Sequence, residues 1–300
     1  MVERYLALFK DQTDQFLQGN DQEFPKTIRV NTLAIPILEE KKRLETKGFD
    51  LASIDGLAYA FQVLDSPLAL GATTEYLVGH YMLQSPASMW AVEVLGPRGD
   101  QLVVDMCAAP GGKTTLIAQL MENQGAIVAT DISRNRIRSL RSNLSRMRVE
   151  NSLVMRMDAA QLPDLGLQAD AVLLDAPCTG EGLIPLDPSR KQSRTPADYT
   201  TLAQVQRKLI VAGAKLLRKG GVMVYSTCSF APEENEEIID FALQQCPLRI
   251  ISTNLPFGDS GLTSFFGHEV DASLRLARRF YPYKHGMEGF FICKMEKQTA

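Results

Sequence analysis

The spacing of apolar residues changes in character near residue 100. Beyond that point, short apolar runs alternate with longer segments in which apolar residues recur every three or four positions. Runs of the first kind predict buried strands, segments of the second kind predict helices, and their alternation predicts βαβ units around a parallel sheet. The expected strands are residues 102–105, 127–131, 153–155, 171–175 and 222–226. The expected helices are residues 114–121, 132–147 and 198–217.

The C-terminal part adds one helix and two strands to this pattern. Pro232 and the two glutamates after it are typical of a helix start, and the helix should run to about residue 245. Residues 248–252 and 289–294 are expected to be strands that form an antiparallel edge, separated by a long polar loop. About seven strands result, so the expected fold class is α/β with a mostly parallel sheet.

The first hundred residues follow a different pattern. An amphipathic helix precedes a strand at residues 28–33, a helix that starts at Pro36, and a further strand at residues 58–64. The sequence Gly-Pro-Arg-Gly at residues 96–99 is typical of a linker. We therefore expect a small α+β domain over residues 1–98 and the α/β domain over residues 99–300. The apolar residues of the first helix are Tyr5, Leu6, Leu8, Phe9 and Phe16.

Composition narrows the class of protein. The chain has 300 residues, of which 45% are hydrophobic, as expected for one large or two unequal globular domains. Five cysteines without a CxxC pair argue against a disulfide framework and a zinc site, and reduced thiols favour the cytoplasm. No segment resembles a signal peptide, and no run approaches the roughly 18 apolar residues of a membrane span. We expect a cytoplasmic protein without a metal or a membrane segment.

The distribution of charge matters more than its sum. A net charge of −3 does not indicate a nucleic-acid binder. A run of basic residues usually forms a solvated surface, but three basic clusters, two of them beside motif-bearing loops, favour contact with a polyanion. The first cluster is Arg134, Arg136, Arg138, Arg141, Arg146 and Arg148. The others are Arg190, Lys191 and Arg194, and Arg275, Arg278, Arg279 and Lys284.

A glycine turn follows the first strand of the large domain. The sequence Met-Cys-Ala-Ala-Pro-Gly-Gly-Lys-Thr comes directly after Asp105, where a helix is expected to begin. Glycines let a ligand approach the backbone closely, and helix-terminal N–H groups meet its polar atoms. Cys107 stands where a P-loop requires glycine, and Gly111 and Gly112 are adjacent, unlike the dinucleotide motif. The remaining nucleoside ligand that suits this geometry is S-adenosylmethionine.

Acidic residues follow the next two strands. Asp131 ends the second strand, where an acid would bind ribose hydroxyls, and Asp158 follows the third, where it could accept from the adenine amine. Either aspartate alone is more often a cap or turn residue. Their register with the glycine turn favours the cofactor role.

Two cysteines occupy polar turns after the fourth and fifth strands. Cys178 ends the sequence Asp-Ala-Pro-Cys, and Cys228 lies in Ser-Thr-Cys-Ser. A lone cysteine is usually a small buried hydrophobe, and we interpret Cys246 and Cys293 in this way. Ligands and reactive groups gather at the carboxyl ends of parallel strands, so two thiols there predict covalent chemistry beside a bound nucleotide. Either thiol could supply the nucleophile.

Three motifs in this order resemble those of the Nop/Sun family of RNA cytosine-5 methyltransferases, namely residues 105–114, 175–178 and 226–229. Shorter similar stretches are residues 29–33, 84–89, 233–237 and 289–291, so the resemblance extends from about residue 25 to the end. It implies a class I methyltransferase fold with a Rossmann-like sheet, S-adenosylmethionine as methyl donor, and RNA recognition by the N-terminal domain. By the family pattern, the residues that line the cofactor and the base are Cys107, Ala108, Ala109, Pro110, Gly111, Gly112, Lys113, Asp131, Asp158 and Asp175.

The resemblance also gives the two thiols separate roles. Cytosine C5 is too weak a nucleophile to take a methyl group unaided, and addition of a thiolate to C6 makes it enamine-like. The family pattern implies that Cys228 attacks C6, that Cys178 assists release of the product, and that Asp175 hydrogen-bonds the N3/N4 edge of the base.

The expected reaction is therefore methyl transfer to C5 of cytosine in RNA. The compact chain favours tRNA as substrate, with rRNA as the alternative, and we expect a monomer. A non-catalytic RNA-binding factor for ribosome assembly is the competing hypothesis, disfavoured because Cys178, Cys228 and Asp175 are all intact. A DNA methyltransferase would need a DNA-reading domain, and no segment here is large enough for one.

Overall fold

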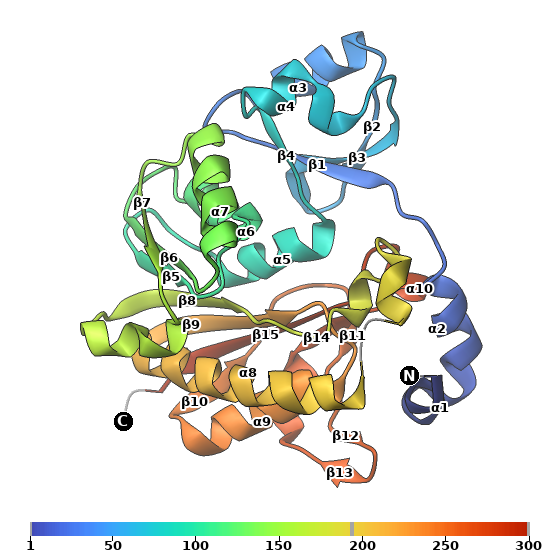
Figure 1. Cartoon of the computed structure of the whole chain (residues 1–300), viewed down its shortest axis with the longest axis vertical. Coiled ribbons are helices and arrows are strands. Elements are labelled where there is room, and N and C mark those ends of the chain that lie inside the picture. The colour runs from blue at the N-terminus through green and yellow to red at the C-terminus, as the bar shows by residue number, and fades with distance from the viewer. Residues whose placement is uncertain (1, 193–194, 299–300) are drawn as a thin grey trace. The chain divides into compact units, whose positions relative to one another are not determined.

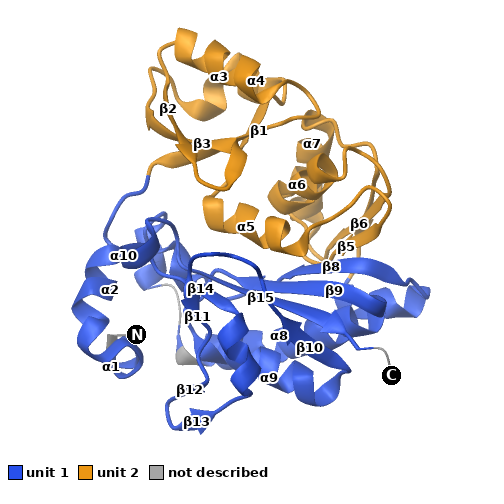
Figure 2. Cartoon of the chain, turned by 180° about the vertical axis from the view of Figure 1, so that it is seen from behind, with its two compact units in different colours: residues 1–24, 158–300 blue, residues 25–157 orange. Residues whose placement is uncertain are grey.

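The computed structural model describes residues 2–192 and 195–298. The chain divides into two compact units, which Figure 2 shows in different colours. Residues 1–24 and 158–300 form the cysteine unit, so called because it contains Cys178 and Cys228, and residues 25–157 form the glycine-turn unit. The boundary predicted between residues 98 and 99 lies inside the glycine-turn unit, and a separate RNA-recognition domain over residues 1–98 stays a prediction.

The glycine-turn unit begins with a four-stranded antiparallel sheet in the order β2-β3-β1-β4 (Figure 1). As predicted, Pro36 directly precedes a helix, α3 (Ile37–Thr46), whose Leu44 packs with Phe61 in the core of this sheet. A short helix, α4 (Thr74–Leu77), precedes the last strand. The strands are β1 (Lys26–Val30), β2 (Asp50–Ile54), β3 (Leu57–Asp65) and β4 (Tyr81–Leu83).

The rest of this unit is the first part of the predicted α/β pattern. Strand β5 pairs with β6, and β6 with β7, all in parallel. Leu140 and Leu144 of α7 lie on its apolar side and pack with Ala108 and Ala109 of the glycine turn, so this helix lies against the turn. The strands are β5 (Leu102–Asp105), β6 (Ala126–Asp131) and β7 (Ser152–Arg156). The helices are α5 (Pro86–Leu95), α6 (Gly112–Leu120) and α7 (Arg134–Arg146).

The cysteine unit contains the two remaining parallel strands and a group of antiparallel ones. Strand β8 (Ala169–Asp175) pairs in parallel with β9 (Leu217–Thr227), and β15 (Phe290–Lys297) pairs with β9 in the antiparallel direction. The long helix α8 (Pro196–Leu216) joins β8 to β9, and α9 (Glu236–Gln245) follows β9. Among the described residues, no helix is both long and apolar enough to cross a membrane.

The prediction of an antiparallel pair near the C-terminus is confirmed, but the prediction of a plain loop between its strands is wrong. Strand β10 (Leu248–Ile251) pairs with β15, which also pairs with β14 (Arg278–Phe280), so β15 is not an edge strand. The polar stretch forms short elements whose few apolar residues gave no clear period. They are β11 (Asp259–Ser260), β12 (Ser264–Phe265), β13 (His268–Glu269), β14 and α10 (Pro282–His285).

The N-terminal amphipathic helix is present as two helices. They are α1 (Val2–Phe9) and α2 (Thr13–Gly19), joined by a 3-10 turn at Lys10–Gln12. Tyr5 and Phe16 pack against Phe230 and Tyr281, which are distant in sequence but belong to the same unit. The apolar side of these N-terminal helices therefore packs in the core of the cysteine unit.

Candidate active site

Cys178 and Cys228 meet at the ends of two paired strands. Their Sγ atoms are 3.4 Å apart, and both side chains are half-buried. Strands β8 and β9 run in parallel, with Asp175 opposite Ser226, so the loop after each strand starts at the same level. The N–H of Ala176 donates to the carbonyl of Ser226 at 2.9 Å and continues this pairing into the loops. The prediction that the two thiols share one edge of the sheet is confirmed.

Asp175 lies at the same edge. It is the last residue of β8, and its Oδ1 accepts a hydrogen bond from the Ser226 hydroxyl at 2.8 Å. The three predicted catalytic residues, Asp175, Cys178 and Cys228, are therefore brought together within the cysteine unit.

The surroundings of Cys178 disfavour its ionisation. The hydrogen bond with Cys228 raises the pKa of Cys178 well above its usual range, with burial and the nearby carboxylates Glu234 and Asp175 acting in the same direction. Each of these causes stabilises the thiol form of Cys178 over its thiolate.

Sequence reasoning missed Glu234, which lies beside both cysteine loops. The carboxylate is fully buried and accepts from the backbone N–H of Thr179 at 2.9 Å and from its hydroxyl at 2.5 Å. Burial raises the pKa of Glu234, and hydrogen bonds from Ser229, Thr179 and Gln206 oppose that effect. Glutamates at a helix start are ordinarily solvated, so the apolar pattern did not predict burial here, and the only signal was that residues 233–237 resemble a stretch of the family.

The expected helix from Pro232 is interrupted after one turn. A 3-10 turn covers Pro232–Glu234, and α9 starts only at Glu236, because Asn235 has the non-helical angles φ −116° and ψ −92°. The side chain of Asn235 accepts from the Thr227 hydroxyl at 2.5 Å and donates to the carbonyl of Ser229 at 2.9 Å. The interruption places Asn235 where it bonds to residues on both sides of Cys228.

The glycine turn is held by side chains of the glycine-turn unit. The Thr114 hydroxyl donates to Asp105 Oδ2 at 2.7 Å, and the Asn143 amide donates to the carbonyl of Pro110 at 2.9 Å. Arg136 donates to the carbonyl of Ala109. Gly111 has a φ of +110°, a conformation that side chains rarely adopt. Cys107 and Lys113 of this turn are half-buried.

The two aspartates proposed for the cofactor both act as cap or turn residues. Asp131 Oδ1 accepts from the N–H of Ser133 at 2.9 Å, and its Oδ2 lies 3.3 Å from the Arg136 guanidinium. Asp158 Oδ1 accepts from the N–H of Ala160 at 2.9 Å. These contacts are compatible with a second role, and the cofactor roles stay predictions.

The basic clusters contain fewer available cations than predicted. Arg279 is buried in an ion pair with Glu236, and Lys284 pairs with Asp259 at 2.6 Å. In the second cluster, Arg190 pairs with Asp187 at 3.3 Å, Lys191 pairs with Asp21, and Arg194 lies outside the described residues. Four of the described members of these two clusters are thus paired with acids of the cysteine unit, whereas Arg278 donates to the carbonyls of Arg275 and Ala277 and Arg275 is exposed.

The arginines of α7 divide into two groups. Arg136 donates to the glycine turn, and Arg146 donates to the carbonyls of Tyr76 and Tyr81 at 2.7 and 3.1 Å. Arg134, Arg138 and Arg141 are exposed, and their spacing of four and three residues places them on one side of the helix. We call these three residues the arginine stripe.

The two remaining cysteines are both predicted to be buried. Cys246 is half-buried, which differs from that prediction, whereas Cys293 is buried as predicted.

Comparison with known proteins shows to which family the chain belongs. Residues 92–296 match the family model described as 16S rRNA methyltransferase RsmB/F. The chain belongs to this family. It is 40% identical to a mouse 28S rRNA (cytosine-C(5))-methyltransferase over 94% of the chain and 36% of that protein. It is 35% identical to the tRNA (cytosine(49)-C(5))-methyltransferase of Pyrococcus abyssi over 99% of the chain and 95% of that protein.

A solved structure confirms the fold class. NSun6 from Pyrococcus horikoshii, crystallised with SFG, superposes with a TM-score of 0.89 at 28% identity, over all of this chain and 98% of that one. The chain therefore has the class I methyltransferase fold, and the resemblance to RNA cytosine-C5 methyltransferases is confirmed. The chain spans between about a third and a half of the length of the first curated relatives that it matches.

Proposed function

We propose that this chain transfers a methyl group from S-adenosylmethionine to C5 of cytosine in RNA. The observation that carries the proposal is the 3.4 Å contact between the Cys178 and Cys228 sulfurs, at the ends of paired parallel strands with Asp175 beside them. Activation of C5 requires one thiolate, and release of the methylated base is helped by a second group, so a pair of thiols at this place suits the reaction. Membership in a family of RNA cytosine-C5 methyltransferases supports the same reaction.

The raised pKa of Cys178 supports a division of labour between the thiols. Cys228 adds as a thiolate to C6 of cytosine, so that an S–C6 bond forms and C5 becomes nucleophilic. After methylation, a base takes the proton from C5, the electron pair restores the C5–C6 double bond, and the S–C6 bond breaks. Cys178 serves this second stage, and Asp175 holds the N3/N4 edge of the base.

The glycine turn has features that suit S-adenosylmethionine, which supplies the methyl group when bound. Gly111 has a φ of +110°, and a Cβ there would come within 3.0 Å of the Leu140 side chain, so this tight turn requires glycine. Helix α6 begins at Gly112, and the N–H groups of a first helical turn lack intrahelical partners. Residues 107–113 and Asp131 would hold the cofactor, with Asp158 and Asp175 added by the family pattern. The use of SFG, an analogue of S-adenosylmethionine, in the NSun6 structure supports this assignment.

We propose tRNA as the substrate, with rRNA as the second candidate. The Pyrococcus abyssi relative, which is named as a tRNA enzyme, matches this chain over nearly its whole length. The mouse relative, named for 28S rRNA, is more similar in sequence but extends far beyond the matched region. The family model carries the name of a 16S rRNA enzyme, which keeps rRNA as a specific alternative.

Transfer of labelled methyl groups tests the proposal. The purified chain, S-adenosylmethionine with a tritiated methyl group, and separate unmodified tRNA and rRNA fractions should give 5-methylcytosine in nucleoside digests of the tRNA. Cys228→Ala is the matched control and should give none. Label in rRNA alone would replace tRNA by rRNA, and no label in any RNA with a folded, cofactor-binding protein would contradict the reaction itself.

A further inference from the structure

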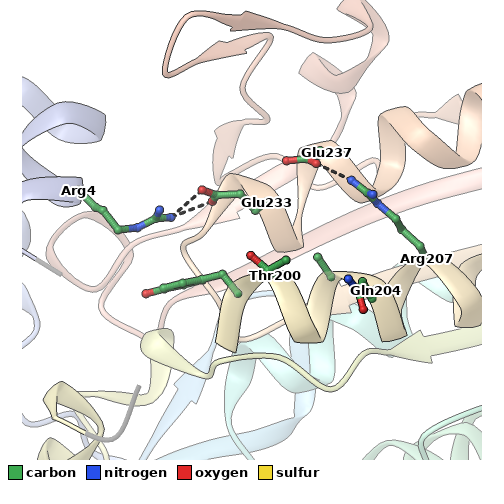
Figure 3. Close-up of a pocket in the computed structure, with 8 residues that line it drawn as sticks. Arg4, Thr200, Gln204, Arg207, Glu233 and Glu237 are labelled. Carbon is green, nitrogen blue, oxygen red and sulfur yellow. Dashed lines mark hydrogen bonds and ion pairs between the residues drawn. The ribbon is translucent and has the colours of Figure 1, made fainter. Parts of the chain in front are cut away.

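Residues 233–237 contain four glutamates. Glu234 and Glu236 face inward and are buried, whereas Glu233 and Glu237 face outward and are half-buried. Glu233 pairs with Arg4 at 2.8 Å, and Glu237 pairs with Arg207, around a pocket of about 260 Å³ on the surface of the cysteine unit (Figure 3). Both outward carboxylates are thus paired with arginines at the surface of the cysteine unit. Glu237 therefore provides a matched control for the buried Glu234.

The inward Glu234 holds the loop of Cys178 on both of its sides. Its carboxylate accepts from the N–H and hydroxyl of Thr179, which follows the cysteine. The Gln206 amide donates to the same carboxylate at 3.2 Å and to the carbonyl of Pro177, which precedes the cysteine, at 2.8 Å. The two carboxylate oxygens thus accept from three donors, two from Thr179 and one from Gln206.

The next residue, Asn235, holds the loop of Cys228 in the same way. It bonds to Thr227 before the cysteine and to Ser229 after it. The two loops are also joined directly, because the Thr179 and Ser229 hydroxyls lie 3.2 Å apart. Consecutive residues of one buried segment therefore hold the neighbours of both thiols, and one hydroxyl pair closes the network between them.

We infer that Glu234 is a positioning residue that sets the separation of the Cys178 and Cys228 sulfurs. The inference rests on the proposed function for its catalytic meaning, because release of the product requires Cys178 close to the bond that Cys228 makes. Its geometric content is independent of any activity. Removing the acceptor frees Thr179 and with it the Cys178 loop, while the Cys228 loop keeps its bonds to Asn235.

Cross-linking of the two thiols measures their separation directly. Diamide joins neighbouring thiols into a disulfide by taking up the two hydrogens that the thiols lose, and mass spectrometry of the linked peptides gives the rate for this pair in the full chain. Glu234→Gln and Thr179→Val should each slow cross-linking by roughly 10- to 100-fold, as expected for loss of hydrogen bonds to a buried carboxylate. Thr179→Ser keeps the hydroxyl and should restore the rate, and Glu237→Gln should leave it unchanged.

Methyl transfer provides the second readout. Glu234→Gln should lower kcat by a similar factor without changing KM for S-adenosylmethionine, because Glu234 does not belong to the glycine turn. Wild-type cross-linking rates in both Glu234→Gln and Thr179→Val, with thermal unfolding showing folded proteins, would overturn the inference. Thr179→Val removes one hydroxyl and so decides the question even if Glu234→Gln does not fold. A wild-type chain that methylates no RNA would contradict the proposed function, whereas the cross-linking rates would still decide the role of Glu234.

Discussion

The glycine turn and the pair of cysteine loops both follow parallel strands, but the protein holds them by different means. The turn is fixed by side chains that donate to its backbone carbonyls, such as Arg136 to Ala109 and Asn143 to Pro110. The cysteine loops are fixed by a buried carboxylate and a buried amide, Glu234 and Asn235, from a single segment. The turn is held through its backbone and therefore depends on its own glycines. The thiol pair is held by buried polar side chains that take no part in the reaction themselves.

The largest expected effect concerns the buried charge of the cysteine unit. Arg279 donates to Glu236 Oε1 at 2.6 Å and to the carbonyl of Phe230 at 3.0 Å. Arg279→Met should lower the free energy of unfolding by about 3–5 kcal/mol, because it leaves Glu236 buried without this cation. Arg249→Met, which breaks the exposed pair with Glu296, should cost less than about 1 kcal/mol. Urea unfolding measures both, and equal losses would show that the buried ion pair of the cysteine unit supports it no more than the exposed one.

A smaller effect is expected at the cofactor end of the comparison. Asp131→Ala should weaken binding of S-adenosylmethionine by about 1–3 kcal/mol through loss of a buried acceptor. Ser133→Ala is the matched control, because it removes only the hydroxyl that caps α7 at the N–H of Arg136 and keeps the backbone N–H that donates to Asp131. That variant should lose about 1 kcal/mol of stability and keep its affinity. Calorimetry that finds the same affinity in folded Asp131→Ala as in the wild type removes Asp131 from the cofactor site.

The thiol pair makes a prediction about pH. The hydrogen bond with Cys228 raises the pKa of Cys178, so Cys228→Ala should lower it, although burial and the carboxylates of Glu234 and Asp175 still raise it. At any pH below that pKa, a larger fraction of Cys178 is then thiolate, and alkylation by iodoacetamide is faster. The pH–rate profile of Cys178 labelling, followed by peptide mass spectrometry, should move to lower pH. An unchanged profile would show that burial and the two carboxylates set this pKa without a contribution from Cys228.

The smallest effect is expected on the exposed arginine stripe. Reversing Arg134 and Arg138 to glutamate should reduce the slope of log affinity against log salt for RNA by roughly 0.7 to 0.9 for each phosphate that the protein no longer neutralises. The same double reversal at Arg218 and Arg249, which pair with Asp170 and Glu296, should leave the slope unchanged. Equal slopes for the wild type and the Arg134 and Arg138 variant would identify the stripe as a solvated surface.

The glycine turn and the cysteine loops also differ in how much of their structure the sequence predicts. The glycine turn and the strands before it follow local patterns, and β5, β6, β8 and β9 lie within a few residues of their predicted places. The proximity of the two thiols follows from parallel strands that end in register.

The network behind the thiols has no such local signal. Pro232 and its glutamates predict an ordinary helix start, yet the helix breaks at Asn235 and buries Glu234, because the partners of these residues lie far away in sequence. The N-terminal helices are amphipathic in the sequence, but the pattern does not reveal that Phe230 and Tyr281 cover them. The short strands between residues 259 and 280 have too few apolar positions for any period to appear.

In the proposed mechanism the two thiols act in sequence, with Cys228 making the bond to the base and Cys178 acting only after methyl transfer. The most direct test is to incubate each cysteine variant with RNA and S-adenosylmethionine and to look for a protein–RNA adduct on a denaturing gel. Cys178→Ala should accumulate a methylated, covalent adduct, and Cys228→Ala should form none while still binding RNA. An adduct in Cys228→Ala would make Cys178 the nucleophile. If RNA is methylated and neither substitution changes the amount of adduct, covalent catalysis by this pair is contradicted.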